Sequence, residues 1–358
     1  QWYDQAVAGT TGGYVENFAM FTWGDNEYGQ LGQYIEFNPD RSSPCQVPGT
    51  TALWSNKAGA CATNSNNSRM CAIKTDGTAW GWGLGPSGQL GHNDVITPAP
   101  PVVSPRQVGT DTTWRSVQAG DAATIWTKTD GTLWMSGANT QGGLGLNEAS
   151  PAKYSSPVQI GTGTDWSENV WTGEQGRAGA VKTDGTLWQW GYADNGTIGN
   201  NTNQGVLDAY SSPIQIPGTT WSTTLGNTAF TGQNFVMLKT DNTLWAWGYN
   251  QNGALANNKT NDSSPKGGRS SPVQIPGSWL SGSLGGGRYM SAVKTDGTLW
   301  VWGRDYEGCF GQNAPTSSRS SPVQVGTDTN WRIDDYMGAS PVHSLAIKTD
   351  GTLWGWGW

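Results

Sequence analysis

The apolar residues of this chain come in short runs that alternate with polar turns. One run, clearest at residues 291–293, leads into a Lys-Thr-Asp-Gly turn, and the next run reads Leu-Trp-x-Trp-Gly. Asp-Gly between two apolar runs is a strong hairpin signal, because glycine accepts a positive φ without a clash at Cβ. Tryptophans two residues apart lie on the same face of a strand. The pattern therefore predicts hairpins of short strands, and no stretch has the period of an amphipathic helix.

The hairpin recurs at a nearly fixed spacing. Its first tryptophan returns every 54 to 57 residues, at Trp80, Trp134, Trp188, Trp245, Trp300 and Trp354. Each period also contains a Trp-led segment, such as residues 114–120, and a Ser-Ser-Pro-Val-Gln-Ile/Val segment, such as residues 155–160. Four predicted strands per period indicate a repeat protein with one small sheet per repeat. The leading tryptophan occurs seven times, at Trp2, Trp54, Trp114, Trp166, Trp221, Trp279 and Trp331.

We therefore predict an all-β fold, a seven-bladed β-propeller of mostly four-stranded blades that forms a single domain over residues 1–358. A linear β-solenoid is the alternative, although its repeats are usually shorter. The Ser-Ser-Pro segment follows only repeats one to six, so either one blade has three strands or a closing strand lies outside this sequence. A chain that begins without methionine and stops inside a repeat also fits a fragment or a processed product.

The full repeat supports a family resemblance. The pattern Gly…Ala-x-Lys-Thr-Asp-Gly-Thr-Leu-Trp-x-Trp-Gly-x-Asn-x-x-Gly-Gln-Leu-Gly resembles the repeat of the regulator of chromosome condensation (RCC1) family over essentially the whole chain. The resemblance implies a seven-bladed propeller. The family includes guanine-nucleotide exchange factors, ubiquitin-ligase modules, secreted inhibitors and many bacterial and viral proteins, so the fold leaves the function open. Trp-rich, weakly charged repeats that are nearly identical resemble the bacterial and phage members.

Charge and composition narrow the possible partners. The formal net charge is −7 and the isoelectric point is about 4.8, so the surface repels phosphate backbones and disfavours nucleic acid as a partner. Only 13% of residues are charged, against ~25% in typical globular domains. Such a composition favours an extracellular or virion-surface location. No apolar stretch is long enough to span a membrane. The chain shows no basic-plus-apolar N-terminal signal, so we expect that any such signal has been removed.

Cysteine, histidine and aspartate give little sign of metal binding or catalysis. Cys45, Cys61, Cys71 and Cys309 contain no Cys-x-x-Cys pair, and the two histidines do not suggest zinc. Cys61 and Cys71 flank one predicted loop, where a disulfide is possible, whereas Cys45 and Cys71 also fit buried apolar positions. The aspartates of the repeated turns are expected to cap those turns. We therefore predict a protein that is not an enzyme and has no metal or cofactor.

Candidate binding residues follow from what the repeat leaves variable. The position five residues before each turn lysine differs between repeats, and we expect it to lie in a loop at one end of the ring, as part of a recognition surface. The alternative is that these are ordinary solvated loop residues. The residues are Arg69, Ala123, Arg177, Asn234, Tyr289 and His343.

Tryptophan supplies the remaining candidates, because aromatic rings stack on sugars. All but three of the 22 tryptophans fall on repeated positions, where packing between blades is the simpler explanation. The off-pattern residues are Trp126, Trp171 and Trp358, and Trp126 replaces the small residue of most other repeats. We predict that Trp126 joins the variable residues in binding a protein or glycan partner.

These observations predict a non-enzymatic binding propeller, an adhesive or structural component of a virion or a bacterial cell surface. A secreted inhibitor or regulator with one tight protein partner is the alternative. A guanine-nucleotide exchange factor comes last, because the sequence offers no specific support for it.

Overall fold

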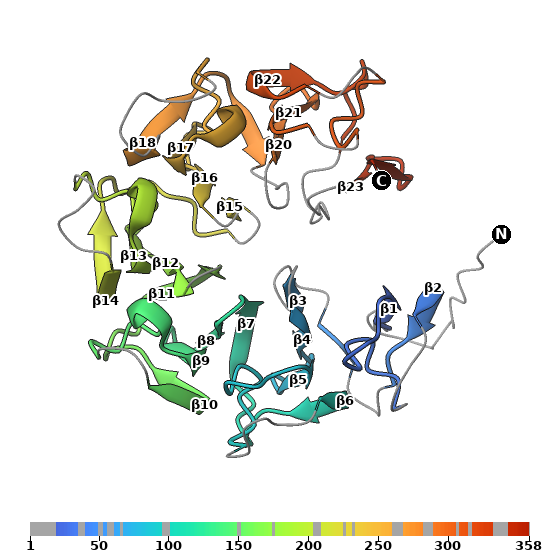
Figure 1. The fold of residues 1–358 in the computed structure, drawn as a ribbon, viewed down its shortest axis with the longest axis vertical. Helices are drawn as coiled ribbons and strands as arrows, with labels where there is room; N and C mark the ends of the chain where they lie inside the picture. The colour runs from blue at the N-terminus through green and yellow to red at the C-terminus, as the bar shows by residue number, and fades with distance from the viewer. Residues whose placement is uncertain are drawn as a thin grey trace, which may run out of the picture.

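Seven antiparallel sheets stand around a common axis in the computed structural model (Figure 1). Five of the sheets have four strands, and two sheets, at the two ends of the chain, have two described strands each. The predicted all-β propeller with mostly four-stranded blades is confirmed. The structure describes residues 19–34, 40–48, 53–55, 61–64, 67–94, 101–148, 152–173, 176–202, 209–224, 227–230, 233–259, 268–281, 289–305, 308–313, 317–331 and 343–357.

The five complete blades repeat one strand order, with the first strand nearest the axis and the fourth at the rim (Figure 1). Blade two consists of β3 (Cys61–Asn64), β4 (Asn67–Ile73), β5 (Ala79–Gly83) and β6 (Val102–Gln107). Blade three consists of β7 (Trp114–Ala119), β8 (Ala123–Lys128), β9 (Leu133–Ala138) and β10 (Lys153–Gln159). Blade four consists of β11 (Trp166–Thr172), β12 (Ala178–Lys182), β13 (Leu187–Tyr192) and β14 (Ala209–Ile216). Blade five consists of β15 (Thr228–Phe230), β16 (Asn234–Leu238), β17 (Leu244–Tyr249) and β18 (Gly268–Ile275). Blade six consists of β19 (Trp279–Ser281), β20 (Tyr289–Lys294), β21 (Leu299–Gly303) and β22 (Arg319–Gln324).

The two end blades are described only in part. In blade one, the third and fourth strands of the repeat are β1 (Phe21–Gly24) and β2 (Arg41–Gln46). In blade seven, the second and third strands are β23 (His343–Ile347) and β24 (Leu353–Gly357). Single 3₁₀ turns lie in the links between third and fourth strands, at η1 (Thr140–Gly142), η3 (Asp194–Gly196) and η4 (Gln251–Gly253). None of the described residues forms a helix long and apolar enough to cross a membrane.

The glycine at the end of each third strand has a positive φ, between +89° and +120°. In blade three, β8 and β9 pair from Ala123 opposite Gly137 to Thr127 opposite Leu133. Gly137 has a φ of +120°, and a Cβ there would lie 2.5 Å from the carbonyl oxygen of Ala122. The chain entering the second strand therefore crosses directly over this glycine, and only glycine leaves room for it.

The Ser-Ser-Pro segments form the outermost strands. In blade three, the register between β9 and β10 shifts between Tyr154 and Val158, around Pro157. Proline lacks the N–H that a central strand needs, and an edge strand with a bulge tolerates this loss. The placement of proline at a sheet edge is as the sequence predicts.

The hydrophobic core lies between neighbouring blades. One cluster joins Leu133, Leu144 and Ile160 of blade three to Trp166 and Trp190 of blade four, and all five side chains are buried. Equivalent clusters repeat around the ring. Burial of an aromatic side chain stabilises the fold by several kcal/mol at about 25 cal/mol/Å². The tryptophans at the repeated positions therefore stabilise the packing of each sheet on the next.

Candidate protein-binding face

The hairpin turns emerge together on one face of the ring, and each has the same hydrogen bonds. In blade three, Asp130 Oδ1 accepts from the backbone N–H of Thr132 at 2.9 Å and from its hydroxyl at 2.7 Å. The same hydroxyl oxygen accepts from the indole N–H of Trp134 at 2.7 Å. The predicted capping role of the aspartates is therefore confirmed. The other five turns have the same three bonds, at Asp76, Asp184, Asp241, Asp296 and Asp350.

The lysine of each turn is held between two indole rings beneath the aspartate. Lys128 Nζ lies 4.8 Å from the ring centroid of Trp114 and 4.1 Å from that of Trp134. The arrangement follows from the register, because Trp114 pairs with Lys128 across β7 and β8. A cation over the face of tryptophan is a favourable contact. Equivalent pairs of contacts are made by Lys74, Lys182, Lys239, Lys294 and Lys348.

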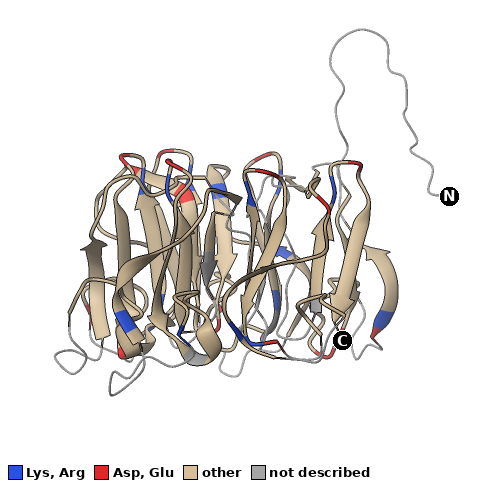
Figure 2. Ribbon diagram, turned by 90° about the horizontal axis from the view of Figure 1, so that it is seen from above, with Lys and Arg blue, Asp and Glu red and all other residues tan. Residues whose placement is uncertain are grey.

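All six turn aspartates are exposed, whereas the turn lysines are less so: Lys74, Lys128 and Lys348 are buried, and Lys182, Lys239 and Lys294 are half-buried. Asp130 is exposed, whereas Lys128 is only 8% exposed and also pairs with the Asp111 carboxylate at 3.0 Å. Hydrogen bonds from Thr132 hold the pKa of Asp130 below its usual value, so the carboxylate is ionised at neutral pH. Repeated around the ring, this gives an acidic face, and the edge-on view shows acidic residues along that rim with basic residues beneath (Figure 2).

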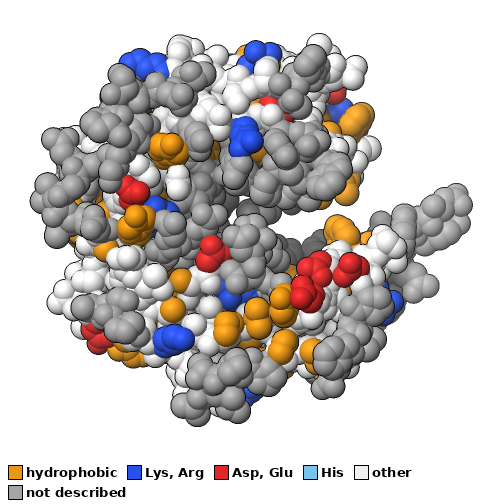
Figure 3. All heavy atoms as spheres, viewed as in Figure 1, with side chains coloured by type: hydrophobic (Ala, Val, Ile, Leu, Met, Phe, Trp, Pro, Cys, Tyr) orange, Lys and Arg blue, Asp and Glu red, His pale blue; other side chains and the backbone are white. Residues whose placement is uncertain are grey.

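On the opposite face, which carries the links between third and fourth strands, the described acidic side chains lie scattered among basic and apolar ones (Figure 3). From the sequence we predicted only that the six turn aspartates cap their own turns. The periodic spacing of the aspartates also predicts that they lie on one face of the ring. The burial of the neighbouring lysines cannot be predicted from the sequence. We define the acidic turn face by Asp76, Asp130, Asp184, Asp241, Asp296 and Asp350.

The variable position before each turn lysine is not in an exposed loop, and that prediction was wrong. Arg69 and Arg177 are each 1% exposed, Asn234 is 6% and Tyr289 is 0%. Each of them lies in or next to the first part of a second strand. The register sets Arg69 opposite Gly83, Asn234 opposite Gly248 and Tyr289 opposite Gly303, and Arg177 directly precedes β12. His343 begins β23 opposite Gly357, and its side chain lies outside the described part of the structure. Burial removes the four described side chains from the surface that a macromolecule could reach.

Arg69 shows why this position is variable. Its guanidinium donates to the carbonyl oxygens of Gly120 and Asp121 in blade three and, at 3.4 Å, to that of Leu84 in its own blade. Burial lowers the pKa of the guanidinium, although three carbonyl partners hold the cation in place. The side chain thus fixes one blade to the next, as the Tyr289 hydroxyl does through its 2.6 Å hydrogen bond with Ser344, whereas Asn234 donates to the carbonyl oxygen of Tyr249 in its own blade.

Trp126 fills the core space that a tryptophan of the third strand fills in other blades. Blade three has Ser136 where other repeats carry the second tryptophan of the third strand. The Trp126 ring is fully buried, 5.6 Å and 54° from the Trp114 ring, which matches 5.6 Å and 51° between Trp54 and Trp82 in blade two. An indole from the second strand therefore replaces the missing indole of the third. The prediction that Trp126 forms part of an accessible binding site was wrong for this reason.

The other off-pattern tryptophans give no site either. Trp171 is 6% exposed and packs edge-on against Phe235 of blade five, with ring centroids 5.9 Å apart. Trp358 lies outside the described residues. Since the described off-pattern rings are buried, the expectation of a glycan partner that rested on those rings is not supported.

The suggested disulfide is absent. Cys71 is a free, fully buried thiol, and burial raises its pKa to about 11. The register of β3 and β4 pairs Cys61 with Ala72 and Ala62 with Cys71. This one-residue offset places the two cysteine positions on opposite faces of the strand pair. The alternative expectation, a small buried residue at position 71, is confirmed. Within the described ranges, His, Cys, Asp and Glu side chains form no cluster that could hold a metal ion.

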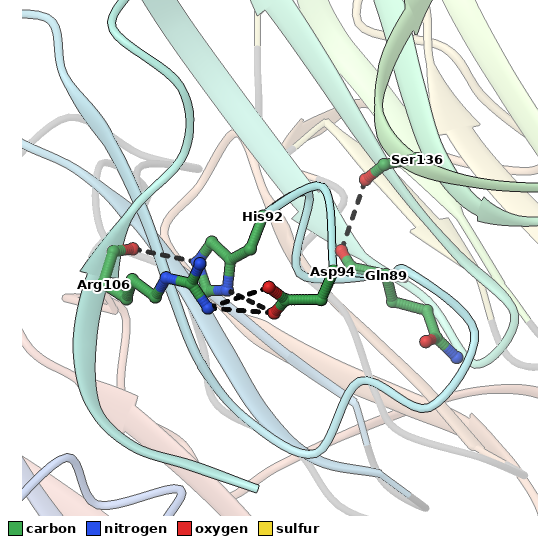
Figure 4. A network of polar contacts seen from close by, with 5 residues as sticks. All are labelled: Gln89, His92, Asp94, Arg106 and Ser136. Atoms are coloured by element: carbon green, nitrogen blue, oxygen red, sulfur yellow. Dashed lines mark hydrogen bonds and ion pairs between the residues drawn. The ribbon is translucent and has the colours of Figure 1, made fainter. Parts of the chain in front are cut away.

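His92 belongs to a structural network in the link of blade two (Figure 4). Its Nε2 is 3.0 Å from the carbonyl oxygen of Arg106, and the Arg106 guanidinium pairs with Asp94 at 2.9 Å. Burial is the main cause of the lowered pKa of His92, so the ring is neutral at pH 7 and Nε2–H donates to the carbonyl. The network fixes the link onto its own fourth strand.

This network predicts loss of stability in weak acid. Because the pKa of His92 is lower in the folded chain than its ordinary value near 6.5, the unfolded chain binds the proton more readily. The contribution of His92 to the free energy of unfolding is therefore fully present above about pH 6.5 and decreases as the pH drops below that value. Thermal melts at pH 7.5 and pH 5.5 measure the effect. His92→Gln keeps a donor without titrating, and a variant with the same decrease as the parent would contradict the assignment.

Comparisons with known proteins agree with the geometry. The model of the Regulator of chromosome condensation (RCC1) repeat matches residues 19–61 and 76–125. The ultraviolet-B receptor UVR8 of Arabidopsis thaliana is 24% identical over 344 residues, which cover 94% of this chain and 72% of the receptor. The secretion-regulating guanine nucleotide exchange factor of Mus musculus is 25% identical over 337 residues, which cover 92% of this chain and 69% of that protein. The ubiquitin ligase HERC2 of Homo sapiens is 25% identical over 241 residues, which cover 67% of this chain but 5% of the ligase.

Two solved structures have the same fold. Human WBSCR16 superposes with a TM-score of 0.76 at 17% identity, covering 95% of this chain and 88% of the other. Yeast RCC1 (Prp20), in its complex with Kap60, superposes with a TM-score of 0.74 at 15% identity, covering 99% and 85%. The chain therefore contains RCC1-like repeats and has the propeller fold of RCC1.

The relatives of this RCC1-like propeller overturn one prediction. Those named above are a receptor, an exchange factor and a ligase of plants and mammals, not viral structural proteins. The predicted role as an adhesive or structural component of a virion or bacterial surface is therefore wrong, and a bacterial or phage origin has no support. The error came from composition, which sets solubility and net charge but not the partner. The extracellular location stays a prediction.

Proposed function

We propose that this RCC1-like propeller is a regulatory protein that binds a basic protein partner on its acidic turn face. The observation that carries the proposal is the separation of charge in the turns, where carboxylates such as Asp130 are exposed and ammonium groups such as that of Lys128 are covered. A ring of like charges on rigid hairpins steers and orients an oppositely charged surface. The same charges disfavour a nucleic acid as the direct partner.

Related propellers support a protein as the partner. The solved structures include yeast RCC1 bound to Kap60 and a study of the binding of Prp20p to Gsp1p and histones. Those interactions belong to the yeast protein, which is 15–16% identical to this chain. They suggest a core histone as the first probe, and the similarity to the mouse guanine nucleotide exchange factor suggests a small GTPase as the second.

The test removes charge without disturbing the turns. Asp130→Asn, Asp184→Asn and Asp241→Asn together keep the amide oxygen that accepts from threonine but remove three carboxylates. At about 0.2–1 kcal/mol per exposed ion pair, the triple variant is expected to bind a core histone about 3-fold to about 100-fold more weakly in isothermal titration calorimetry. The affinity of the parent protein is expected to fall as salt is raised.

A matched control changes the same number of charges on the opposite face. Asp25→Asn, Glu27→Gln and Glu148→Gln lie in links and are expected to leave the affinity nearly unchanged. Equal losses in the two triple variants would mean that only net charge matters, and would overturn the proposal. Failure of the parent protein to bind either probe at low salt would also count against it.

A second candidate is guanine-nucleotide exchange, which the sequence analysis placed last. The observation that favours it is the similarity to the mouse exchange factor, which extends over 92% of this chain. An exchange factor acts by binding its GTPase, so the acidic turn face serves this function as well. Release of a fluorescent GDP analogue from a panel of small GTPases is the measurement. Faster GDP release with the parent protein, lost in the turn-face triple variant, would support exchange activity. Unchanged release throughout the panel would count against exchange and leave protein binding as the supported function.

A further inference from the structure

A groove of about 350 Å³ lies between blades three and four, which are neighbours in the ring (Figure 1). Its walls come from the link of blade three, the loop that leads into blade four, and the fourth strand of blade four. Leu146, Ile160 and Pro213 supply apolar surface, and Trp166 and Lys182 supply an indole and an ammonium group. We call this space the inter-blade groove.

The loop that leads into blade four differs at one position from two loops of the same length. Residues 109–114 read Gly-Thr-Asp-Thr-Thr-Trp and residues 326–331 read Gly-Thr-Asp-Thr-Asn-Trp, whereas residues 161–166 read Gly-Thr-Gly-Thr-Asp-Trp. Gly163 therefore takes the place of Asp111 and Asp328. Gly163 also lines the inter-blade groove, so the place that a carboxylate takes in the other two loops is open here.

The two aspartates that Gly163 replaces cover the turn lysine of the blade that follows. Asp111 pairs with Lys128 at 3.0 Å, and the side chain of this lysine is 10% exposed. Asp328 makes the equivalent contact in blade seven at 2.7 Å. In blade four the pairing carboxylate is that of Asp165, at 3.1 Å, and the Lys182 side chain is 22% exposed. Lys182 is thus less covered than its equivalents, and it lines the groove.

Two buried polar atoms lie close to the open position. A Cβ built on Gly163 would lie 3.1 Å from Asp165 Oδ1 and 3.4 Å from Trp166 Nε1. No described residue gives either atom a hydrogen-bond partner. The leading indoles of four other blades share this property, but among the described aspartates only Asp165 has such a buried, unpaired oxygen. Unpaired buried polar atoms cost free energy, so a group that accepts from the indole and donates to the carboxylate would be held here.

We propose that the inter-blade groove binds a small carboxylic acid with a hydroxyl group on the carbon next to its carboxylate. The ligand carboxylate takes the place beside Lys182 that Asp111 takes in blade three, where the ion pair strengthens its hydrogen bond. The hydroxyl accepts from Trp166 Nε1 and donates to Asp165 Oδ1. This second contact matters because one ammonium group then serves two carboxylates, and the hydroxyl offsets the repulsion between them.

The remainder of the ligand is apolar. Leu146, Ile160 and Pro213 form a wall that suits a branched or aromatic side group. A concave, mostly apolar site with a few directed polar groups is typical of small-molecule binding. None of the turn aspartates lines the groove. The inference therefore goes beyond the proposed function, and a failure of either one leaves the other standing.

The probe is 3-phenyllactate, which combines a carboxylate, a neighbouring hydroxyl and an apolar ring. It is expected to bind the full chain at one site with a Kd on the order of 1 mM. In a nuclear magnetic resonance titration, the indole N–H signal of Trp166, identified as the one missing from Trp166→Phe, is expected to shift. 3-Phenylpropionate lacks the hydroxyl and is expected to bind about 3-fold to about 10-fold more weakly. The amide of 3-phenyllactate lacks the charge and is expected to bind at least about 10-fold more weakly.

One double variant closes the site with a loop that the chain already uses. Gly163→Asp with Asp165→Thr copies the Asp-Thr-Thr sequence of residues 111–113 and leaves the net charge unchanged. Gly163 is not in the left-handed region, so the variant is expected to melt like the parent. Its own carboxylate then pairs with Lys182, and the probe is expected to bind at least about 10-fold more weakly. Thr164→Ser, an exposed position outside the groove, is the control and is expected to bind like the parent.

Three results would overturn the proposal. Equal binding of 3-phenyllactate and its amide would exclude recognition of the carboxylate. Equal binding to the parent and the double variant would place the probe elsewhere. A Trp166 signal that does not move up to about 10 mM probe would mean that water alone fills the groove.

Discussion

Replacing Trp126 with alanine is expected to destabilise the fold by about 3–5 kcal/mol, the usual cost of removing a buried indole. The ring is fully buried, packs on Trp114 and donates to Ser136 Oγ at 3.2 Å. A ligand-binding tryptophan would instead be dispensable for stability. Chemical denaturation followed by circular dichroism measures the loss.

The decisive experiment combines this change with a second one. Ser136→Trp in the Trp126→Ala background recreates the alanine and tryptophan arrangement of blade two, where Ala72 is fully buried and the Trp82 indole donates to the carbonyl oxygen of Gln30. In blade three the equivalent carbonyl is that of Gln89, which now accepts from Ser136 Oγ at 3.3 Å (Figure 4).

The double variant is therefore expected to recover most of the lost stability. Ser136→Trp alone is expected to be destabilising, by about 1–3 kcal/mol, because two indoles then compete for one space. Additive losses in the double variant would contradict the idea that the two positions share that space.

Replacing Gly131 with alanine is expected to cost about 3 kcal/mol or more, because the turn of blade three lies against blade four. Gly131 has a φ of +79°, and a Cβ there would lie 2.0 Å from the carbonyl oxygen of Thr164. The backbone N–H of Trp166 also donates to the carbonyl oxygen of Gly131 at 3.0 Å, so the turn cannot move away without losing that bond. Denaturation midpoints of the parent and the variant measure the difference.

The chain contains a matched control for this change. Gly351 occupies the same turn position in blade seven with a φ of +82°, and no described neighbour lies within 4 Å of a Cβ built there. Gly351→Ala is therefore expected to show only the conformational cost of a left-handed alanine, about 1–2 kcal/mol. Similar losses at the two positions would mean that the contact between blades contributes nothing. Blade five carries Asn242 here with a φ of +63°, so asparagine is the expected milder substitution.

The sequence predicted the fold well because the repeat is a local pattern. Hairpin turns, strand alternation and the proline-containing outer strand each depend on a few adjacent residues, and seven copies make the count secure. The aspartates of the turns were interpreted correctly for the same reason. Asp130, Thr132 and Trp134 are close in sequence, and their hydrogen bonds join residues two apart.

The candidate site was predicted poorly because accessibility depends on the neighbouring blade. Arg69 and Trp126 looked exposed or unusual in their own repeats, but Arg69 contacts a loop 51 residues further along the chain, and Trp126 fills a space left by Ser136. Variation between repeats can mark a contact that every blade makes differently, and not only a recognition surface. Nothing in the sequence of one repeat distinguishes the two.

The sequence by itself determined the number of blades, the strands within them and the chemistry of each turn, because these rest on periodicity and on local hydrogen bonds. The tertiary structure decided which charges reach the surface and which tryptophans serve as wedges. Those properties depend on residues about 50 positions apart that meet only when one blade packs on the next.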